Sequence, residues 1–184
     1  MSGERKRAIT SLPTSCNSAA ALAAESAQPF CRASLPAETH AAALLHDVGK
    51  LVMARFLSPD ILRTLADARE KGGLSSLRAE AELLCVHHGE LGGIIAQHWK
   101  LSDRIVTGIM YHHTPDLARD IVADVVHVAN IAAKLAGTGH VATGADLQVS
   151  PTSLERLGMS TDGFMELTAS VGTQLDSVLA AYAC

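Results

Sequence analysis

Apolar side chains recur at alternating steps of three and four residues along most of the chain, the period of a helix with one buried face. The clearest stripe lies in 77–99 and consists of Leu77, Ala81, Leu84, His88, Leu91 and Ile95. A second stripe near the carboxyl end consists of Phe164, Leu167, Val171, Leu175 and Val178. No segment shows the period-two alternation of a half-buried strand. The pattern therefore predicts an all-α protein.

Proline, glycine and capping residues divide this pattern into separate helices. We expect helices over 18–27, 37–47, 50–56, 59–71, 77–99, 103–113, 120–136 and 151–157, and a last one that begins at Ser160 or Thr161. Gly49 is expected to end or bend the helix before it, and 139–148 to form a loop. Residues 1–14 are expected to be a flexible segment, and 15–184 to form a single domain.

Composition narrows the class of protein. Apolar residues make up 48% of the chain but aromatic residues only 3%, which favours closely packed helices over a sheet. The formal net charge of -4 gives no general attraction to nucleic acid or anionic membranes, and the Arg5-Lys6-Arg7 cluster is expected to be a solvated tail. No apolar run is long enough for a membrane span. We therefore expect a soluble cytoplasmic protein whose partners include neither nucleic acid nor membrane.

The pattern of the four cysteines also favours a cytoplasmic protein. Cys16, Cys31, Cys85 and Cys184 form no CxxC pair and have no tight spacing. We expect them to be reduced thiols, most of them buried, in a reducing compartment.

Candidate chemistry comes from three histidine positions on three predicted helices. His46-Asp47 ends an apolar helix, His88 lies on the buried stripe of 77–99, and His112-His113 follows Ile109 by three and four residues. A core histidine bonded to a neighbouring helix would explain any one of them. Because imidazole and carboxylate are good ligands for divalent metals, the three positions together favour a shared polar or metal pocket.

The other histidines carry less information. His87 is rotated off the stripe and is expected to be exposed. His98 is explained by packing beside Trp99, and His127 by a polar surface shared with Asp120, Asp124 and Lys134. For these, and for His40 and His140, we expect structural roles.

The order of these features resembles the HD superfamily of metal-dependent phosphohydrolases, and within it the HD-related output domain, HDOD. The matching residues, in chain order, are Ala42-Ala43-Leu44-Leu45-His46-Asp47-Val48-Gly49-Lys50-Leu51, then Glu80, Leu84 and His88-Gly89-Glu90-Leu91-Gly92, then Trp99, Leu101, Ile109, His112-His113 and Pro115, and finally Val125, His127-Val128-Ala129-Asn130 and Ala132. The resemblance covers roughly 15–140 and implies an HD-domain-like helical bundle. It also implies a long N-terminal helical region that is absent or much shortened here, as in a trimmed chain or a minimal member of the family.

Two positions depart from the catalytic members of the superfamily. Their helix before the His-Asp pair carries a histidine, where this chain has Cys16, Asn17 and Ser18. Their later helix carries an aspartate, where this chain has Asn130, a neutral and weaker ligand.

The resemblance leaves two functions open. The first is a bacterial signalling module, non-catalytic or weakly catalytic, in which His46, Asp47, His88, His112 and His113 form a residual cluster that holds a metal or a phosphorylated ligand. Its partner would be another signalling protein or a second copy. The alternative is a metal-dependent phosphohydrolase acting on a phosphate ester or nucleotide, with Asp47 and Lys50 in catalytic roles, although a solvated helix end would also explain Lys50. The ligand types suit iron, manganese, zinc or nickel alike.

Overall fold

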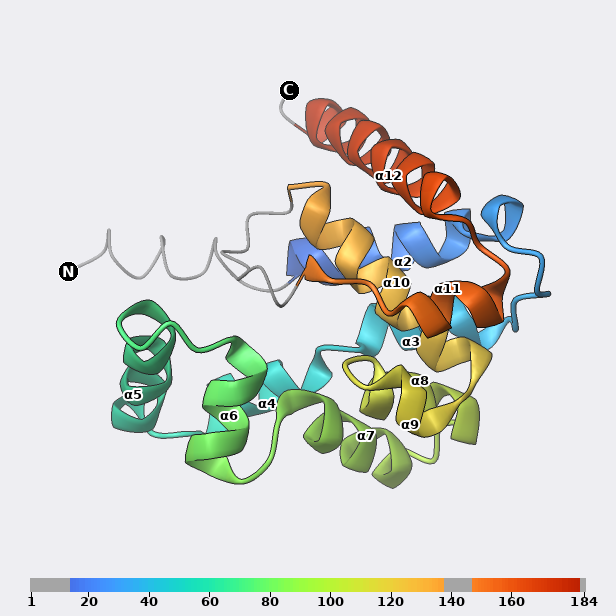
Figure 1. The fold of residues 1–184 in the computed structure, drawn as a ribbon. Coiled ribbons are helices and arrows are strands. Elements are labelled where there is room, and N and C mark those ends of the chain that lie inside the picture. Colours follow the sequence, from blue (N-terminus) through green and yellow to red (C-terminus); the bar gives the residue numbers. More distant parts are fainter. Residues whose placement is uncertain (1–13, 138–146, 183–184) are drawn as a thin grey trace.

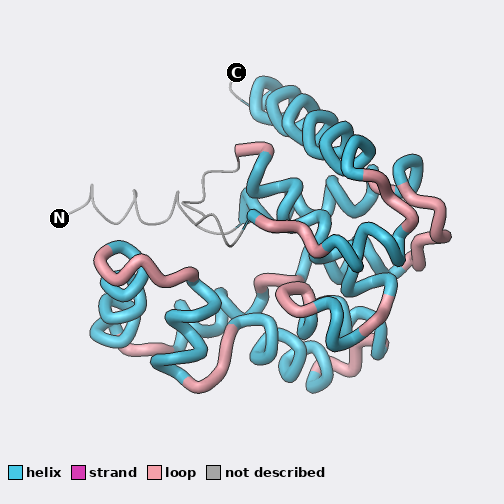
Figure 2. Tube along the Cα trace, viewed as in Figure 1, coloured by secondary structure: helices cyan, strands magenta, loops and turns pink. Residues whose placement is uncertain are grey.

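The computed structural model describes residues 14–137 and 147–182, which contain helices and no strands (Figures 1 and 2). In chain order the elements are α2 (Thr14–Ser26), η1 (Gln28–Phe30), α3 (Glu38–Leu45), α4 (Val48–Phe56), α5 (Pro59–Glu70), α6 (Ser76–Leu84), α7 (His88–His98), α8 (Asp103–Tyr111), α9 (Pro115–Ala118), α10 (Ile121–Leu135), α11 (Pro151–Leu157) and α12 (Thr161–Tyr182). The all-α prediction is confirmed.

Helix α10 is the centre of the bundle. Every residue from Val122 to Ala133 is buried, and α2, α3, α8, α11 and α12 all pack against it. The face of α2 that meets it is built from Ala19, Ala20, Ala23 and Ala24. Small side chains allow this close approach of two helix backbones, as the low aromatic content suggested.

The second half of the bundle surrounds α7. Helices α4 and α8 pack against α7, and Val48, Ala96, Val106 and Ile109 form a small apolar cluster between them. Helices α5 and α6 pack against each other at the lower left of Figure 1, away from α10. Ile105 of α8 packs against both apolar clusters and so links the two halves.

The predicted single helix over 77–99 is wrong, because the chain breaks between α6 and α7. Cys85 adopts a left-handed conformation with φ 58°, and His87 caps α7. The His87 ring accepts the backbone N–H of Glu90, and the Glu90 carboxylate accepts the N–H of His87 in return, which forms a capping box. His87 is therefore half-buried, contrary to the expected exposure. The buried residues of α6 are Ala79 and Glu80, while Ala81 is exposed.

Gly49 does not end a helix, contrary to expectation. The interruption lies one step earlier, at His46 and Asp47, and Gly49 belongs to the first turn of α4. A Cβ atom at Gly49 would lie 2.0 Å from the backbone oxygen of His88. The glycine is therefore required by the contact between α4 and the start of α7.

Most other predicted helices are close to those observed, but α2 begins at Thr14, four residues before the predicted start at Ser18. Each predicted end of α8, α10, α11 and α12 lies within two residues of the observed end. At the start of α12, the Ser160 hydroxyl accepts the backbone N–H of Gly163. Pro115 follows α8 but opens the short α9. Of the flexible segment predicted over 1–14, only Thr14 is described, and it begins α2. The Arg5-Lys6-Arg7 cluster, His140 and most of the predicted loop lie outside the described residues.

The cysteine prediction is only partly right. Cys31 is a free, half-buried thiol and Cys85 a free, exposed one, so neither is fully buried. The side chains of Cys16 and Cys184 lie outside the described part. Across the described helices, none combines the length and hydropathy needed to cross a bilayer.

Candidate metal centre

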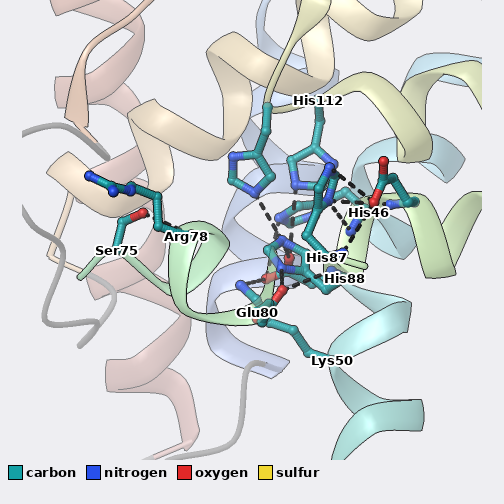
Figure 3. A network of polar contacts seen from close by, with 12 residues as sticks. His46, Lys50, Ser75, Arg78, Glu80, His87, His88 and His112 are labelled. Atoms are coloured by element: carbon teal, nitrogen blue, oxygen red, sulfur yellow. Dashed lines mark hydrogen bonds and ion pairs between the residues drawn. The ribbon is translucent and has the colours of Figure 1, made fainter. Parts of the chain in front are cut away.

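Helix ends bring the predicted site residues together. His46 follows α3, Asp47 precedes α4, His88 opens α7, and His112 and His113 follow α8. Figure 3 shows His46, His88 and His112 close together. His46, Asp47, His88 and His112 are each at most 2% exposed. A helix end is a suitable place for such a group, since the chain direction changes there and adjacent side chains diverge.

Three imidazole rings are fixed in the same way. The Nδ1 of His46 donates to the carbonyl of Ala43 at 2.7 Å, and the Nδ1 of His112 donates to the carbonyl of Ile109 at 2.7 Å. The Nδ1 of His88 lies 2.6 Å from the Glu80 carboxylate, which also accepts the backbone N–H of His88. Since an oxygen acceptor needs a proton on Nδ1, the Nε2 of each ring has a lone pair when the ring is neutral. This is the arrangement found in metal-binding histidines.

The Asp47 carboxylate faces these rings. Its Oδ1 lies 3.2 Å from Nε2 of His88 and 4.0 Å from Nε2 of His112, and its Oδ2 lies 3.6 Å from Nε2 of His46. Lys50 donates to Oδ2 at 2.7 Å and is 25% exposed in its side chain. Lys50 is therefore an ion-pair partner of Asp47, and the solvated helix-end alternative is wrong.

Burial and neighbouring charge set the protonation of the group. Burial alone would raise the pKa of Asp47, but His46, Lys50 and His88 hold it well below its usual value, so the carboxylate is ionised. Burial lowers the pKa of His46 and, together with neighbouring imidazoles, lowers those of His112 and His113 well below the usual value. An ionised carboxylate beside neutral imidazoles is the form that binds a metal.

Unpaired polar atoms provide the test of fit for a metal. Among the described residues, the buried side-chain atoms without a hydrogen-bond partner are Asn17 Oδ1, His46 Nε2, Asp47 Oδ1, His112 Nε2 and Asn130 Oδ1. Each such atom costs on the order of 1–3 kcal/mol if nothing satisfies it. Three of the five come from the predicted ligands, and one ligand atom from each of His46, Asp47 and His112 lies within 4.8 Å of the others. The donor set therefore fits a divalent cation.

His113 extends this set. One ring nitrogen from each of His88, His112 and His113 lies within 4.8 Å of the others, and the Nε2 atoms of His88 and His113 are 2.9 Å apart. Without an ion, one of these two rings donates to the other across this short distance. Two nitrogens at about 2.1 Å from one ion lie about 3.0 Å apart at a right angle and about 3.4 Å apart in a tetrahedron. The observed separation is thus already that of two ligands of one ion.

The two departures from the catalytic pattern are both buried. Asn17 of α2 and Asn130 of α10 are 9% and 3% exposed. An amide oxygen is a weaker ligand than the histidine nitrogen or carboxylate that the resemblance places there. The resemblance therefore places weaker ligands on α2 and α10 than the histidines beside α7 and α8 provide.

Sequence reasoning missed two residues that support the site. Glu80 had been noted only as part of the family pattern, yet its carboxylate orients His88. Burial acts to raise the pKa of Glu80, but its hydrogen bonds with His88 lower it overall.

His127 is 8% exposed and not on a polar surface, because its Nδ1 donates to the carbonyl of His112 and its Nε2 accepts the N–H of Ser150. Asp124 is likewise buried, in contact with Arg156 and Ser153. The apolar residues around Glu80 and His127 gave no direct signal of these contacts.

Three solved structures have a similar arrangement of helices. An HDOD domain protein of unknown function from Geobacter sulfurreducens is 20% identical, with a TM-score of 0.70 over 91% of this chain and 59% of that one. A candidate phosphohydrolase from Shewanella amazonensis SB2B is 22% identical, with a TM-score of 0.64 over 88% and 62%. A candidate signal-transduction protein from Marinobacter aquaeolei VT8 is 20% identical, with a TM-score of 0.66 over 90% and 38%. This chain spans less than two thirds of each, and at these identities the likeness concerns the fold.

Among curated proteins, none matches this sequence. The HDOD domain family matches residues 4–115, which is more than half of the chain and includes the His46-Asp47 pair, His88 and His112-His113. The chain therefore belongs to the HDOD domain family.

Proposed function

We propose that this protein is a non-catalytic signal-transduction module that binds one divalent metal ion through Asp47, His88, His112 and His113, with His46 beside them. The observation that carries the proposal is the common orientation of the rings: Nδ1 of His46, His88 and His112 is bound to oxygen, and Nε2 faces the Asp47 carboxylate. Such an ion would satisfy buried atoms that otherwise lack a partner. The module acts in the cytoplasm through another signalling protein or a second copy of this chain.

Two observations favour binding without turnover. The atoms that face Asp47 are buried, and catalysis at a metal needs an open position for water and substrate. Asn17 and Asn130 weaken the other half of the ligand set, so the chain offers strong ligands for one ion and not for two. On this reading the ion holds the ends of α3, α7 and α8 together.

The second candidate is a metal-dependent phosphohydrolase, and the position of Lys50 is the observation in its favour. Its ammonium contacts Asp47 while a quarter of the side chain is exposed, so it could meet a phosphate oxygen at the rim of the site. A bound ion would supply a water of lowered pKa and would polarise the phosphoryl group. Asp47 would hold the ion, and Lys50 would orient the phosphate.

Elemental analysis of protein purified without chelator tests metal binding. We expect close to one equivalent of manganese, iron, zinc or nickel in the wild-type protein. Asp47→Asn and His113→Gln should lose most of it, whereas His40→Gln, which changes an exposed ring, should retain it. Circular dichroism must show that each variant is folded. A wild-type protein with no metal, or equal metal in all variants, would refute the proposal.

Turnover assays separate the two candidates. The metal-loaded protein is tested on phosphomonoesters, phosphodiesters and cyclic dinucleotides with added manganese. We expect no turnover above the level of Asp47→Ala. Turnover that Asp47→Ala abolishes and His40→Gln preserves would replace the first candidate with the phosphohydrolase.

A further inference from the structure

Helices α5 and α6 form a hairpin that packs mainly on itself. Each has the other as its main packing partner, and the pair stands apart from α10 in Figure 1. Leu65 is the buried residue of α5, and Ala79 and Glu80 are those of α6. Within the described part of the chain, neither apolar cluster of the bundle includes a residue of this hairpin. The apolar interior of the bundle therefore does not hold the hairpin in its observed position.

A cavity of about 260 Å³ separates the start of α6 from the helices behind it. Ser75 and Arg78 line it on the hairpin side, and His113 and Asn130 line it on the side of α8 and α10. Figure 3 shows Ser75 and Arg78 apart from the histidine cluster. Because facing walls of such a space are not in contact, movement of α6 away from α10 separates no packed atoms there.

A buried polar contact joins the hairpin to the metal centre. The Glu80 carboxylate accepts the backbone N–H of His88 at 2.8 Å and lies 2.6 Å from Nδ1 of the same ring. That N–H belongs to the first turn of α7, where a backbone donor has no acceptor within its own helix. Hydrogen bonds to a charged acceptor are among the stronger ones in proteins. Glu80 therefore holds the hairpin against the start of α7.

The two connections of the hairpin to the bundle have the form of hinges. Leu57 and Ser58, between α4 and α5, are extended, with ψ angles of 147° and 153°. Cys85, between α6 and α7, is exposed and left-handed, with φ 58°. A few residues at helix ends are enough to absorb the change of backbone angles in a hinge movement.

From the separate packing, the cavity, the buried contact and the two connections, we infer that the hairpin α5–α6 is a lid over the metal centre. It turns about residues 57–58 and 85–86, and Glu80 holds it closed. An ion on Nε2 of His88 would draw electron density from the ring and make Nδ1–H a stronger donor to Glu80.

Binding of the ion and closure of the lid therefore favour each other. The ion-bound state is then the closed one, which agrees with a buried, non-catalytic centre. The lid itself does not depend on the ion, whereas its control by the ion rests on the proposed function. The inference goes beyond that function, because it names the part of the molecule that changes position when the ion binds.

Double electron–electron resonance between two spin labels measures the position of the lid. The labels are attached to Arg69→Cys near the far end of α5 and to Gln97→Cys in α7, both exposed positions, in the full chain with its native cysteines replaced by serine. Helix α5 has 12 residues and is about 18 Å long, so a rotation of about 20° moves its far end by about 6 Å. The first measurements use chelator-treated protein.

We expect Glu80→Ala to show a second population, displaced from the closed distance by about that amount, which is minor in the wild type. Glu80→Gln, which keeps an acceptor oxygen but not the charge, should be intermediate and replaces the alanine variant if that one does not fold. Glu82→Ala, on the exposed face of α6, should match the wild type. Zinc should then shift the wild type and Glu82→Ala toward the closed distance and leave Glu80→Ala unchanged.

The results that would overturn the inference are distinct from those that concern the ion. The same single distance in the wild type and in the folded Glu80 variants would overturn the lid. A matching displacement between labels at Gln97→Cys and Glu166→Cys, both in the bundle, would do the same, because the whole bundle would then be loosened. A wild type that binds zinc without any shift would refute control by the ion. A wild type that binds no zinc, with a lid that opens in Glu80→Ala, removes the proposed function alone.

Discussion

Replacement of Gly49 by alanine tests how closely the fold and the metal centre depend on each other. The new Cβ would lie 2.0 Å from the backbone oxygen of His88 and 2.8 Å from its carbonyl carbon. A carbon needs about 3.3 Å from an oxygen, so α4 and the start of α7 must separate by about 1.3 Å. The obstacle is backbone and cannot rotate away. Asp47 precedes α4 and His88 opens α7, so the separation also pulls two proposed ligands apart.

The expected loss of stability follows from two opposing effects. Overpacking of this kind costs about 3 kcal/mol, at the upper end of the usual range, because no side chain can yield. Alanine in place of glycine within a helix returns about 1 kcal/mol. We therefore expect Gly49→Ala to lower the free energy of unfolding by about 2 kcal/mol, or the Tm by about 4–8 °C for a domain of this size. Urea unfolding followed by circular dichroism measures the former, and elemental analysis should show reduced metal.

Gly172→Ala is the matched control. It makes the same substitution inside α12, where the new Cβ would meet only the Cβ of Ala136 at an ordinary 3.9 Å. It should stabilise the protein by about 0.5–1 kcal/mol and leave the metal content unchanged. If Gly49→Ala proved as stable as Gly172→Ala and kept its metal, the close contact between α4 and α7 could not be a feature of the folded protein.

Three further changes have defined outcomes. Glu80→Ala removes the carboxylate that orients the His88 ring and should lower the free energy of unfolding in urea by about 2–3 kcal/mol. The control Glu82→Ala, on the exposed face of α6, should change that free energy by less than about 0.5 kcal/mol. Arg156→Met removes the cationic partner of the buried Asp124 carboxylate, which keeps the hydrogen bond from Ser153, and should cost about 3–5 kcal/mol in the same assay. Hydrogen bonds from Thr152 and Arg156 lower the pKa of Asp116, so its stabilising contribution is present above about pH 3.9 and is lost as pH falls through the lowered pKa. An NMR titration of the Asp116 carboxyl carbon should have its midpoint below about 3.9, and a midpoint at or above it would contradict the contact.

Much of the fold could be predicted from local signals. The helices over 103–111, 121–135 and 151–157 are bounded by proline, glycine and capping side chains that act within one turn, so single-sequence reasoning found them. The break after Leu84 could not be found in this way, because the apolar spacing continues across it. The causes of the break are the left-handed conformation of Cys85 and the capping box formed by His87 and Glu90. Neither changes the spacing of apolar residues along the sequence.

The same contrast between local signals and tertiary contacts applies to the candidate site. The three histidine positions were found because each continues or ends an apolar stripe of the sequence, although the structure places them at helix ends. The partners that orient them were not found. Glu80 and His127 act across helices, so their roles depend on tertiary contacts that a helical pattern cannot specify.

The placement of Asp47, His88 and His112 at the ends of different helices also bears on how the protein folds. These residues are far apart along the chain, so closing the loops between them must precede any favourable contact among them. A fragment that lacks α7 or α8 contains no complete ligand set, and an early collapsed state with formed helices but loose packing would not hold the ligands at the observed distances. Metal uptake is thus expected to coincide with the last step of folding, which would make it a kinetic marker of the finished tertiary structure.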